Sequence, residues 1–119
     1  MTSSYALYLD DVRHPPQTGE DWVLVRSVAA MLELLEARGI PTLASFDYEL
    51  GRTDPSHDGG DAVASFLEFI QSVANAEEPV DVEVRLHTSS SYGATRMAEL
   101  LGSSCNTCYE AGIRLMHSY

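Results

Sequence analysis

An apolar segment that ends in two adjacent aspartates constrains this chain more than any other feature. Residues 5–13 read YALYLDDVR, so a run typical of a β-strand passes directly into Asp10, Asp11 and Arg13. Such a run predicts a buried strand whose carboxyl end carries the charged groups. Ligands of open α/β sheets bind at that end of the strands. The segment therefore predicts a binding site at the carboxyl end of this strand but does not identify the ligand.

The rest of the chain alternates strand patterns with helix patterns. Two prolines, Pro15 and Pro16, indicate a loop after the first strand. Strand patterns follow at 22–26, 42–46 and 80–86, and helix patterns at 27–38, 61–76 and 92–101. This order predicts an α/β fold, a three-layer sandwich with a mainly parallel sheet and right-handed crossovers.

Two parts of the chain are less definite. Residues 80–86 alternate apolar and charged side chains, which suits a half-solvated strand or an edge strand. Gly102 is expected to end the last helix. Residues 103–119 leave open a final strand or a short helix. With 119 residues in all, we expect a single domain over 1–119.

The charge of the chain limits its partners. The sequence has 18 acidic and 7 basic residues, a formal charge of −11, and no lysine. Such a charge argues against binding the phosphate backbone of duplex DNA. An acidic surface that keeps the protein in solution is the plain interpretation, and the alternative is a protein that imitates nucleic acid or docks on a basic protein partner.

Nothing in the sequence is typical of a membrane or secreted protein. No apolar stretch approaches the length of about 20 residues that spans a bilayer, and the first residues lack a signal-peptide pattern. We therefore expect a cytoplasmic protein without a membrane partner. Cys105 and Cys108 form a lone C-x-x-C, and even with His117 they supply fewer ligands than the four that structural zinc takes. Free thiols are expected, although the role of this pair and of the tail stays open.

Acidic and basic groups follow several predicted strands. Because the carboxyl ends of parallel strands meet at one edge, three groups are expected to converge: Asp10 and Asp11, Asp47 and Glu49, and His87 with Thr88. Oxygen ligands favour Mg²⁺, Mn²⁺ or Ca²⁺. His87 would then be available as a general acid or base, and Arg13 could hold a phosphate oxygen.

Hydroxyl groups follow His87 at the start of the last predicted helix. Thr88 and Ser89 begin a stretch that could offer hydroxyls and backbone N–H groups to a phosphate, and we expect both to bind substrate. Ordinary helix capping explains the stretch equally well.

The order of these motifs is similar to that of a known family. An Asp pair after the first strand, one Asp after the third and a hydroxyl after the fourth resemble the receiver domain of two-component signalling. That family contacts the phosphoryl group with a lysine, which this chain lacks. The chain more closely resembles the cyclic-phosphate processing receiver domain family. The matching segments, in order, are LYLDDVRHPP, WVLVRS, FDYELG, GGDAV and LHTSSSYGATRM.

This resemblance covers about residues 5–101 and leaves 102–119 as a C-terminal extension. It implies a receiver-like, flavodoxin-like topology and processing or hydrolysis of a cyclic phosphate on a nucleotide or RNA end. It also implies a metal site at Asp10 and Asp11, a supporting Arg13, a central Asp47, and an active-site His87 with Thr88 beside it. From the residues and the resemblance together, we expect Asp10, Asp11 and Asp47 to hold Mg²⁺ or Mn²⁺, Asp47 and His87 to be catalytic, and Arg13, Thr88 and Ser89 to bind substrate.

Three functions remain open. The first is a metal-dependent phosphoesterase that acts on a cyclic or terminal phosphate. The second is a non-catalytic receiver-like module that binds a phosphorylated ligand or signals. Tyr48 favours this second function, because the family commonly has histidine there and a phenol with a pKa near 10 is a poor base. The third is an acidic inhibitor or mimic of a basic partner.

Overall fold

The computed structural model describes residues 4–118, so residues 1–3 and 119 of the expected domain lie outside the described chain. Within that range, five parallel strands form one sheet in the order β2-β1-β3-β4-β5. The elements are β1 (Ala6–Leu9), β2 (Trp22–Val25), α1 (Val28–Arg38), β3 (Leu43–Phe46), α2 (Gly59–Val73), β4 (Val80–Leu86), α3 (Ser91–Ala111) and β5 (Ile113–Ser118). The mainly parallel, flavodoxin-like α/β class is confirmed.

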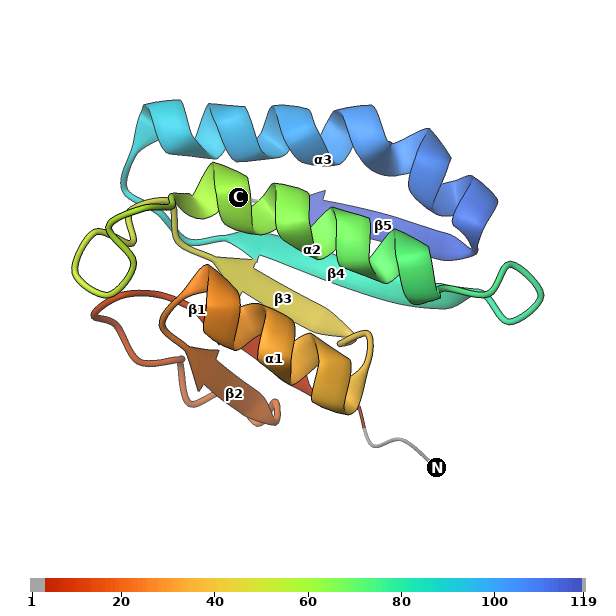
Figure 1. The fold of residues 1–119 in the computed structure, drawn as a ribbon, viewed down its shortest axis with the longest axis horizontal. Coiled ribbons are helices and arrows are strands. Elements are labelled where there is room, and N and C mark those ends of the chain that lie inside the picture. The colour runs from red at the N-terminus through yellow and green to blue at the C-terminus, as the bar shows by residue number, and fades with distance from the viewer. Residues whose placement is uncertain (1–3, 119) are drawn as a thin grey trace.

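The three helices lie on the same face of the sheet (Figure 1). The connections through α1, α2 and α3 all move in one direction across the sheet, and right-handed crossovers in one direction place their helices on one side. The β1–β2 connection moves the opposite way, and it is a loop over residues 10–21. The expected third layer is therefore not helical. We call the two sides the helix-covered face and the helix-free face.

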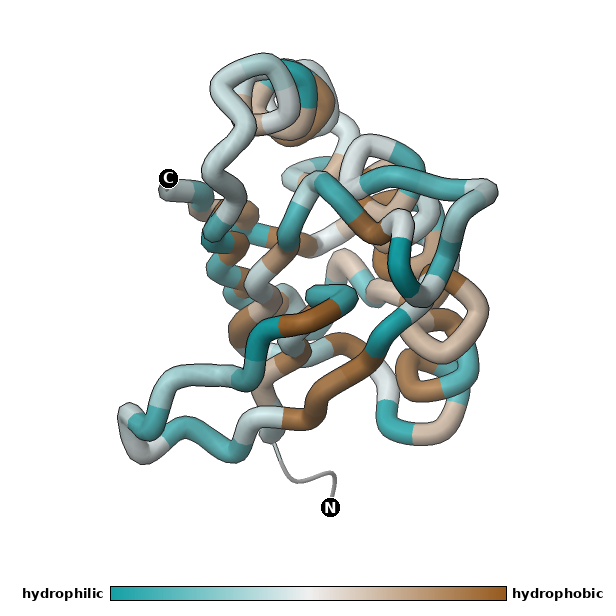
Figure 2. Tube along the Cα trace, turned by 90° about the vertical axis from the view of Figure 1, so that its left-hand side faces the viewer, coloured by the Kyte–Doolittle hydropathy of each residue, from teal (hydrophilic) through white to brown (hydrophobic). Residues whose placement is uncertain are grey.

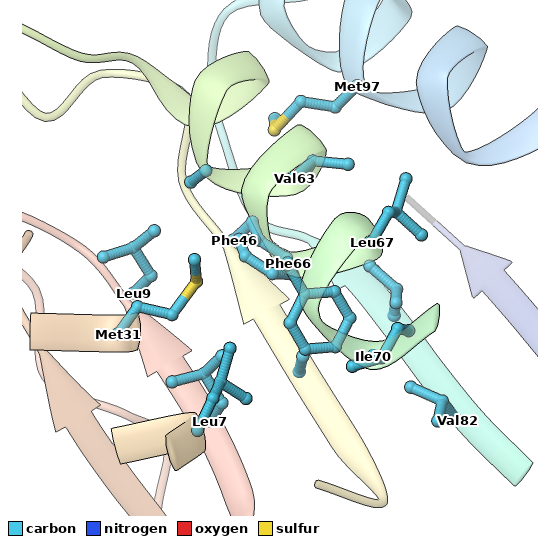
Figure 3. Close-up of a cluster of buried hydrophobic side chains, with 14 of the residues drawn as sticks. Leu7, Leu9, Met31, Phe46, Val63, Phe66, Leu67, Ile70, Val82 and Met97 are labelled. Carbon is cyan, nitrogen blue, oxygen red and sulfur yellow. The ribbon is translucent and has the colours of Figure 1, made fainter. Parts of the chain in front are cut away.

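The helix-covered face forms the apolar core of the domain. Every second strand residue points into it, and the side chains drawn in Figure 3 come from both the sheet and the helices. Phe46 of β3 packs edge-on against Phe66 of α2, with ring centroids 5.3 Å apart. Leu7, Leu9, Met31, Phe46 and Phe66 are all fully buried. Burial of this kind is the main term that stabilises the fold.

The starts of α1 and α2 are set by capping side chains. Ser27 caps α1 as expected, because its hydroxyl accepts from the backbone N–H of Ala30 at 3.1 Å. Asp58 and Asp61 form a reciprocal capping box, so α2 begins at Gly59, two residues before the start at residue 61 that the sequence predicted. A Cβ at Gly59 would lie 2.3 Å from the carbonyl oxygen of Asp47. Glycine therefore lets α2 approach the end of β3.

The C-terminal part of the chain differs from the expectation. The predicted end of the last helix at Gly102 is wrong, since α3 continues to Ala111. Gly102 lies in open space on the helix surface, and the helix ends at Gly112, which has a left-handed φ of +97°. The chain then forms β5, the final strand that the sequence left open. Although α3 has 21 residues, no helix in the described chain is both long and apolar enough to cross a membrane.

The position of β5 also decides the role of β4. β4 pairs with β3 on one side and β5 on the other, so the edge-strand alternative is wrong. Its alternating charges arise because Glu83 and Arg85 lie half-exposed on the helix-free face, while Val82 and Val84 are buried in the core. The half-solvated interpretation is the correct one.

The two cysteines lie within α3 and are free thiols. Cys108 is buried, and its Sγ accepts from the side-chain N–H of Gln71 at 3.4 Å. Burial raises the pKa of this thiol. Cys108 therefore behaves as a small core residue of α3.

Candidate functional site

The site lies one residue beyond the ends of three neighbouring strands. Asp10 follows β1, Asp47 follows β3 and His87 follows β4. The ladder continues past the strands, because Asp47 donates its N–H to the carbonyl of Leu9 and His87 to that of Phe46, both at 3.0 Å. Figure 2 looks onto this end of the molecule, where brown hydrophobic stretches adjoin teal hydrophilic ones. Parallel pairing therefore brings together three residues that are distant in sequence.

The three predicted carboxylates form one cluster. Asp10 is fully buried, Asp47 is 8% exposed and Asp11 is half-buried. One oxygen from each lies within 4.8 Å of the others. Asp11 is held from the loop after β3, since its Oδ2 accepts the backbone N–H of Arg52 at 3.2 Å. The convergence expected from the strand ends is present for these three carboxylates, whereas Glu49 is exposed and lies outside the cluster.

The two buried carboxylates have opposite pKa shifts. Burial works to raise the pKa of Asp10, but two backbone N–H groups, of Arg13 and Val12, each donate to it at 2.8 Å, and these bonds together with His87 hold its pKa below the usual range. Burial raises the pKa of Asp47, and repulsion from Asp10 raises it further. The carboxylate form of Asp10 is therefore stabilised, whereas the carboxylate form of Asp47 is disfavoured by burial and by repulsion from Asp10.

His87 connects the acidic cluster to the helix-free face. Its Nε2 lies 2.9 Å from Oδ2 of Asp10, and its Nδ1 lies 2.7 Å from the hydroxyl of Ser45. Its ring stacks on Tyr8 with centroids 4.4 Å apart and planes 9° from parallel. Burial lowers the pKa of His87, against the opposing effect of Asp10, so the ring is neutral at pH 7. The contacts assign the proton to Nε2, where it bonds to the carboxylate.

Ser45 belongs to this network, and sequence reasoning missed it. It is a buried hydroxyl in β3, two residues before Asp47 and therefore on the same side of the strand. A single polar residue in the apolar strand LASF was the available signal. Its partner, 42 positions away, could not be read from the pattern.

Two arginines border the site. Arg13 was expected to bind substrate, and its Nη1 donates to the carbonyl of His87 at 2.8 Å. Arg26, which the sequence did not single out, donates to the carbonyls of Asp10 and Arg13, both at 3.3 Å. These bonds tie the β1–β2 loop to the ends of β2 and β4. The guanidinium groups thus lie beside the acidic cluster.

The hydroxyl residues after β4 are placed differently from one another. The side chain of Thr88 hydrogen-bonds to Asp47 and acts to lower the pKa of that carboxyl. Ser89 is solvent-exposed. Ser90 caps α3 by accepting the N–H of Gly93 at 3.0 Å. Thr88 is thus part of the cluster, while the capping interpretation of the stretch applies to Ser90.

Tyr48 points toward α3. A Cβ on Gly93 would meet the Tyr48 ring at 2.2 Å, and the ring packs edge-on against Tyr92 at 5.9 Å. Burial raises the pKa of the Tyr48 phenol, and a hydrogen bond to Asp58 raises it further. Tyr48 therefore remains protonated at neutral pH and packs on the start of α3.

The acidic cluster fits a hard divalent cation. Three carboxylates within 4.8 Å, of which two are buried, form an oxygen donor set suited to such an ion. The raised pKa of Asp47 reflects repulsion that a cation would relieve. Asp10, Asp11 and Asp47 together can therefore hold a metal ion.

Comparison with known proteins gives one result. Residues 5–103 match the family model described as the cyclic-phosphate processing receiver domain. No curated protein and no solved structure matched the chain. The matched region contains β1 to β4, most of α3 and all of the site residues described above. Because the match covers well over half of the chain, this protein belongs to the cyclic-phosphate processing receiver domain family.

Proposed function

We propose that this domain binds and hydrolyses a cyclic or terminal phosphate on a nucleotide or RNA end, with Mg²⁺ or Mn²⁺ at Asp10, Asp11 and Asp47. One observation carries the proposal: the buried carboxylate cluster is joined directly to a neutral histidine, through the 2.9 Å contact of Asp10 with His87. Family membership supports the choice of a cyclic phosphate.

The reaction on a cyclic phosphate needs one water molecule and one proton transfer. Water attacks phosphorus, one P–O bond of the ring breaks, and the released ribose oxygen takes a proton to leave a phosphomonoester. A bound divalent cation would polarise the phosphoryl oxygens and offset the developing negative charge. The protein must then supply a group that takes a proton from water and returns one to the leaving oxygen.

His87 is suited to that proton transfer. Its Nε2–H is held by Asp10, so Nδ1 carries the basic lone pair, and the Ser45 hydroxyl lies 2.7 Å from it. A proton accepted at Nδ1 gives an imidazolium that Asp10 stabilises. Because Ser45 lines a cavity next to the acidic cluster, its hydroxyl can relay the proton between His87 and a water molecule bound where the cavity adjoins the cluster. Ser45 is a positioning and relay residue in this scheme.

The remaining predicted residues would orient the phosphate. Arg13 lies beside His87, and a guanidinium is the side chain best matched to phosphate oxygens. Thr88 already bonds to Asp47 and could turn its hydroxyl toward a phosphate. Ser89, exposed at the same edge, completes the predicted binding set.

A second function is favoured by a specific observation. Both ring nitrogens of His87 are engaged, and Tyr48 is bonded to Asp58. Such a site can hold a phosphate without moving a proton. The second candidate is therefore a non-catalytic module that binds a phosphorylated ligand at the same cluster.

The metal site is tested first, by thermal unfolding with and without Mn²⁺. The wild type should gain stability at millimolar Mn²⁺, and Asp11→Asn should lose that gain because one oxygen ligand becomes a neutral amide. Glu49→Gln is the matched control, since this exposed carboxylate lies in the loop after β3 that contacts Asp11 through Arg52, but is outside the cluster. No stabilisation of the wild type would contradict the metal site.

Catalysis is tested with 2′,3′-cyclic AMP and Mn²⁺. His87→Gln should lower turnover by about 10²–10⁴-fold, the usual contribution of a general acid or base. It should retain the Mn²⁺ stabilisation, which separates loss of proton transfer from loss of the site. Wild-type binding without turnover would replace the phosphoesterase with the binding module.

A further inference from the structure

A cavity of about 440 Å³ lies next to the candidate site and has no assigned role. Four aromatic rings line it, those of Tyr8, His14, Trp22 and His87. Polar groups of Ser45 and Arg85 line it as well. This volume lies within the range of about 300–1,000 Å³ typical of small-molecule sites, and ring walls with a few polar groups are typical of such sites.

The strand register places this cavity relative to the acidic cluster. Tyr8, Ser45 and Arg85 are paired across β1, β3 and β4, so they form one row on the helix-free face. The row of Asp10, Asp47 and His87 lies two residues further along the same strands. Two residues of a strand span about 6.6 Å. The cavity therefore begins one such step behind the predicted phosphate site.

His87 contacts both the acidic cluster and the cavity. Its Nε2 contacts Asp10 in the acidic cluster, while its ring stacks on Tyr8 and lines the cavity. A ligand with its phosphate at the cluster would thus extend past this ring into the cavity. The other part of that ligand must match an aromatic enclosure with hydrogen-bonding groups at its edge.

The lining chemistry matches a planar heterocycle. Trp22 packs edge-on against Tyr8 at 5.5 Å, and its indole N–H is anchored to Thr18 at 3.2 Å, so the aromatic wall is held in place. Arg85 is bound to Glu83 through Nε at 2.7 Å, and a guanidinium has further N–H donors. These N–H groups can donate hydrogen bonds to the ring nitrogens and carbonyl oxygens of a base.

We propose that this cavity binds the nucleobase of the nucleotide end whose phosphate lies at the acidic cluster. The assignment of the phosphate rests on the proposed function, whereas the base contact rests on the cavity itself. Stacking on aromatic walls accepts every base, so the site selects a nucleotide over a sugar phosphate and discriminates little between sequences.

Trp22 makes the proposal directly measurable. It is the single tryptophan of the chain, and it lines the cavity, so the intrinsic fluorescence reports on this site. The protein is titrated with adenosine, with 2′,3′-cyclic AMP and with ribose 5-phosphate, using excitation at the red edge of the indole band. Adenosine and the cyclic nucleotide should change the emission, and ribose 5-phosphate should not. Mn²⁺ should tighten binding of the cyclic nucleotide and leave adenosine unaffected.

A blocking variant supplies the structural test. Ser118 is an exposed residue of β5 that lines the cavity, so Ser118→Phe fills the space from outside the core. It should weaken adenosine binding by about 5- to 150-fold, the range that corresponds to loss of stacking on one base. Met116→Phe is the matched control on the same strand and face, at a residue that does not line this cavity. It should bind like the wild type.

Each contrary result has a definite meaning. If adenosine leaves the emission unchanged at millimolar concentration, or if both variants lose binding equally, the base site is wrong. If adenosine binds but Mn²⁺ does not tighten binding of the cyclic nucleotide, the proposal that one nucleotide occupies both the cavity and the acidic cluster is wrong. Failure of the proposed function would appear elsewhere, as absent Mn²⁺ stabilisation or absent turnover, while adenosine binding would persist.

Discussion

The two faces of this sheet consist of the same strands but have different roles: the helix-covered face forms the core, and the helix-free face carries residues of the candidate site. On β3, Phe46 points to the helices and is packed by Phe66, while the adjacent Ser45 points the other way and contacts His87. On β1, Leu9 lies in the core, while Tyr8 and Asp10 lie on the helix-free side. Because side chains alternate along a strand, a residue that stabilises the core is followed directly by a residue that belongs to the candidate site.

The difference follows from where the helices lie. The helix-covered face is largely removed from water, and its central residues are fully buried, so apolar side chains there contribute most to stability. The helix-free face is covered by the loop of residues 10–21 only in part, which leaves a cavity beside the acidic cluster. Polar and aromatic residues can occupy this face at low cost. A sheet with one uncovered face can therefore carry a site along its strands as well as at their ends.

The sharpest test of this division compares two leucines. Leu7→Ala, on the helix-covered face, should lower the free energy of unfolding by about 2–5 kcal/mol, because it leaves a cavity in a packed core. Leu24→Ala, on the adjacent strand but half-buried on the helix-free face, should cost about 1 kcal/mol. Urea unfolding measures both. Equal losses would show that the helix-free face is as much a core as the other.

A second test disturbs the site from the helix side. Gly59→Ala should lower the free energy of unfolding by about 1–3 kcal/mol, because its Cβ would lie 2.3 Å from the Asp47 carbonyl oxygen and 2.6 Å from Cα of Tyr48. It should also weaken Mn²⁺ binding by displacing Asp47. Gly102→Ala is the control, since a Cβ there meets nothing within 4 Å. Unchanged Mn²⁺ affinity in Gly59→Ala would mean that the two faces are not coupled through α2.

The smallest expected effect concerns the charge of Asp47. Burial and repulsion raise its folded-state pKa above the unfolded value, so its ionised form destabilises the metal-free fold once the pH exceeds the folded pKa. Asp47→Asn should therefore raise the free energy of unfolding at pH 7 without metal, by about 1 kcal/mol. The gain should shrink as the pH falls below the folded pKa, since the wild-type carboxyl then becomes neutral too.

Thermal unfolding of both proteins from pH 7 down to pH 4 checks the sign. Added Mn²⁺ should reverse the order at pH 7, because the wild type binds the ion and Asp47→Asn binds it poorly. Glu49→Gln, which removes an exposed charge nearby, should show neither effect. A wild type more stable than Asp47→Asn in the absence of metal would contradict the repulsion between Asp47 and Asp10.

Much of the site could be predicted because strand ends are marked in the sequence. Asp10, Asp47 and His87 each follow an apolar run, and parallel pairing requires such positions to meet. Ser45 and Arg26 were missed, because their roles depend on partners 42 and 16 positions away. Neither residue has a distinctive local pattern. Thr88 and Ser89 were both predicted to bind substrate because they share a motif. Only contacts in the fold distinguish Thr88, which bonds to Asp47, from exposed Ser89.

The same reasoning explains the errors in the fold. The number and order of strands and helices up to residue 101 follow from apolar spacing, which is a local property. The end of α3 was misplaced because a surface glycine weakens a helix without ending it, and the packing of α3 on the core outweighs that cost. The non-helical third layer depends on the β1–β2 loop and on the direction of each crossover, which no single segment encodes.

The apolar spacing of the sequence was enough to predict the parallel α/β class and the edge where the carboxylates gather, because strand alternation and strand ends are local properties. The resemblance of its motifs to known sequences was enough to predict the family. Only the tertiary structure decided that the pKa of Asp10 is lowered while that of Asp47 is raised. It also decided that His87 bonds to Ser45 and that a cavity adjoins the acidic cluster. These properties depend on which strands are neighbours and which face lacks helices. The burial of these side chains and the distances between them are set only when the chain folds, and they determine the pKa values of the carboxyl groups and the position of the proton on His87.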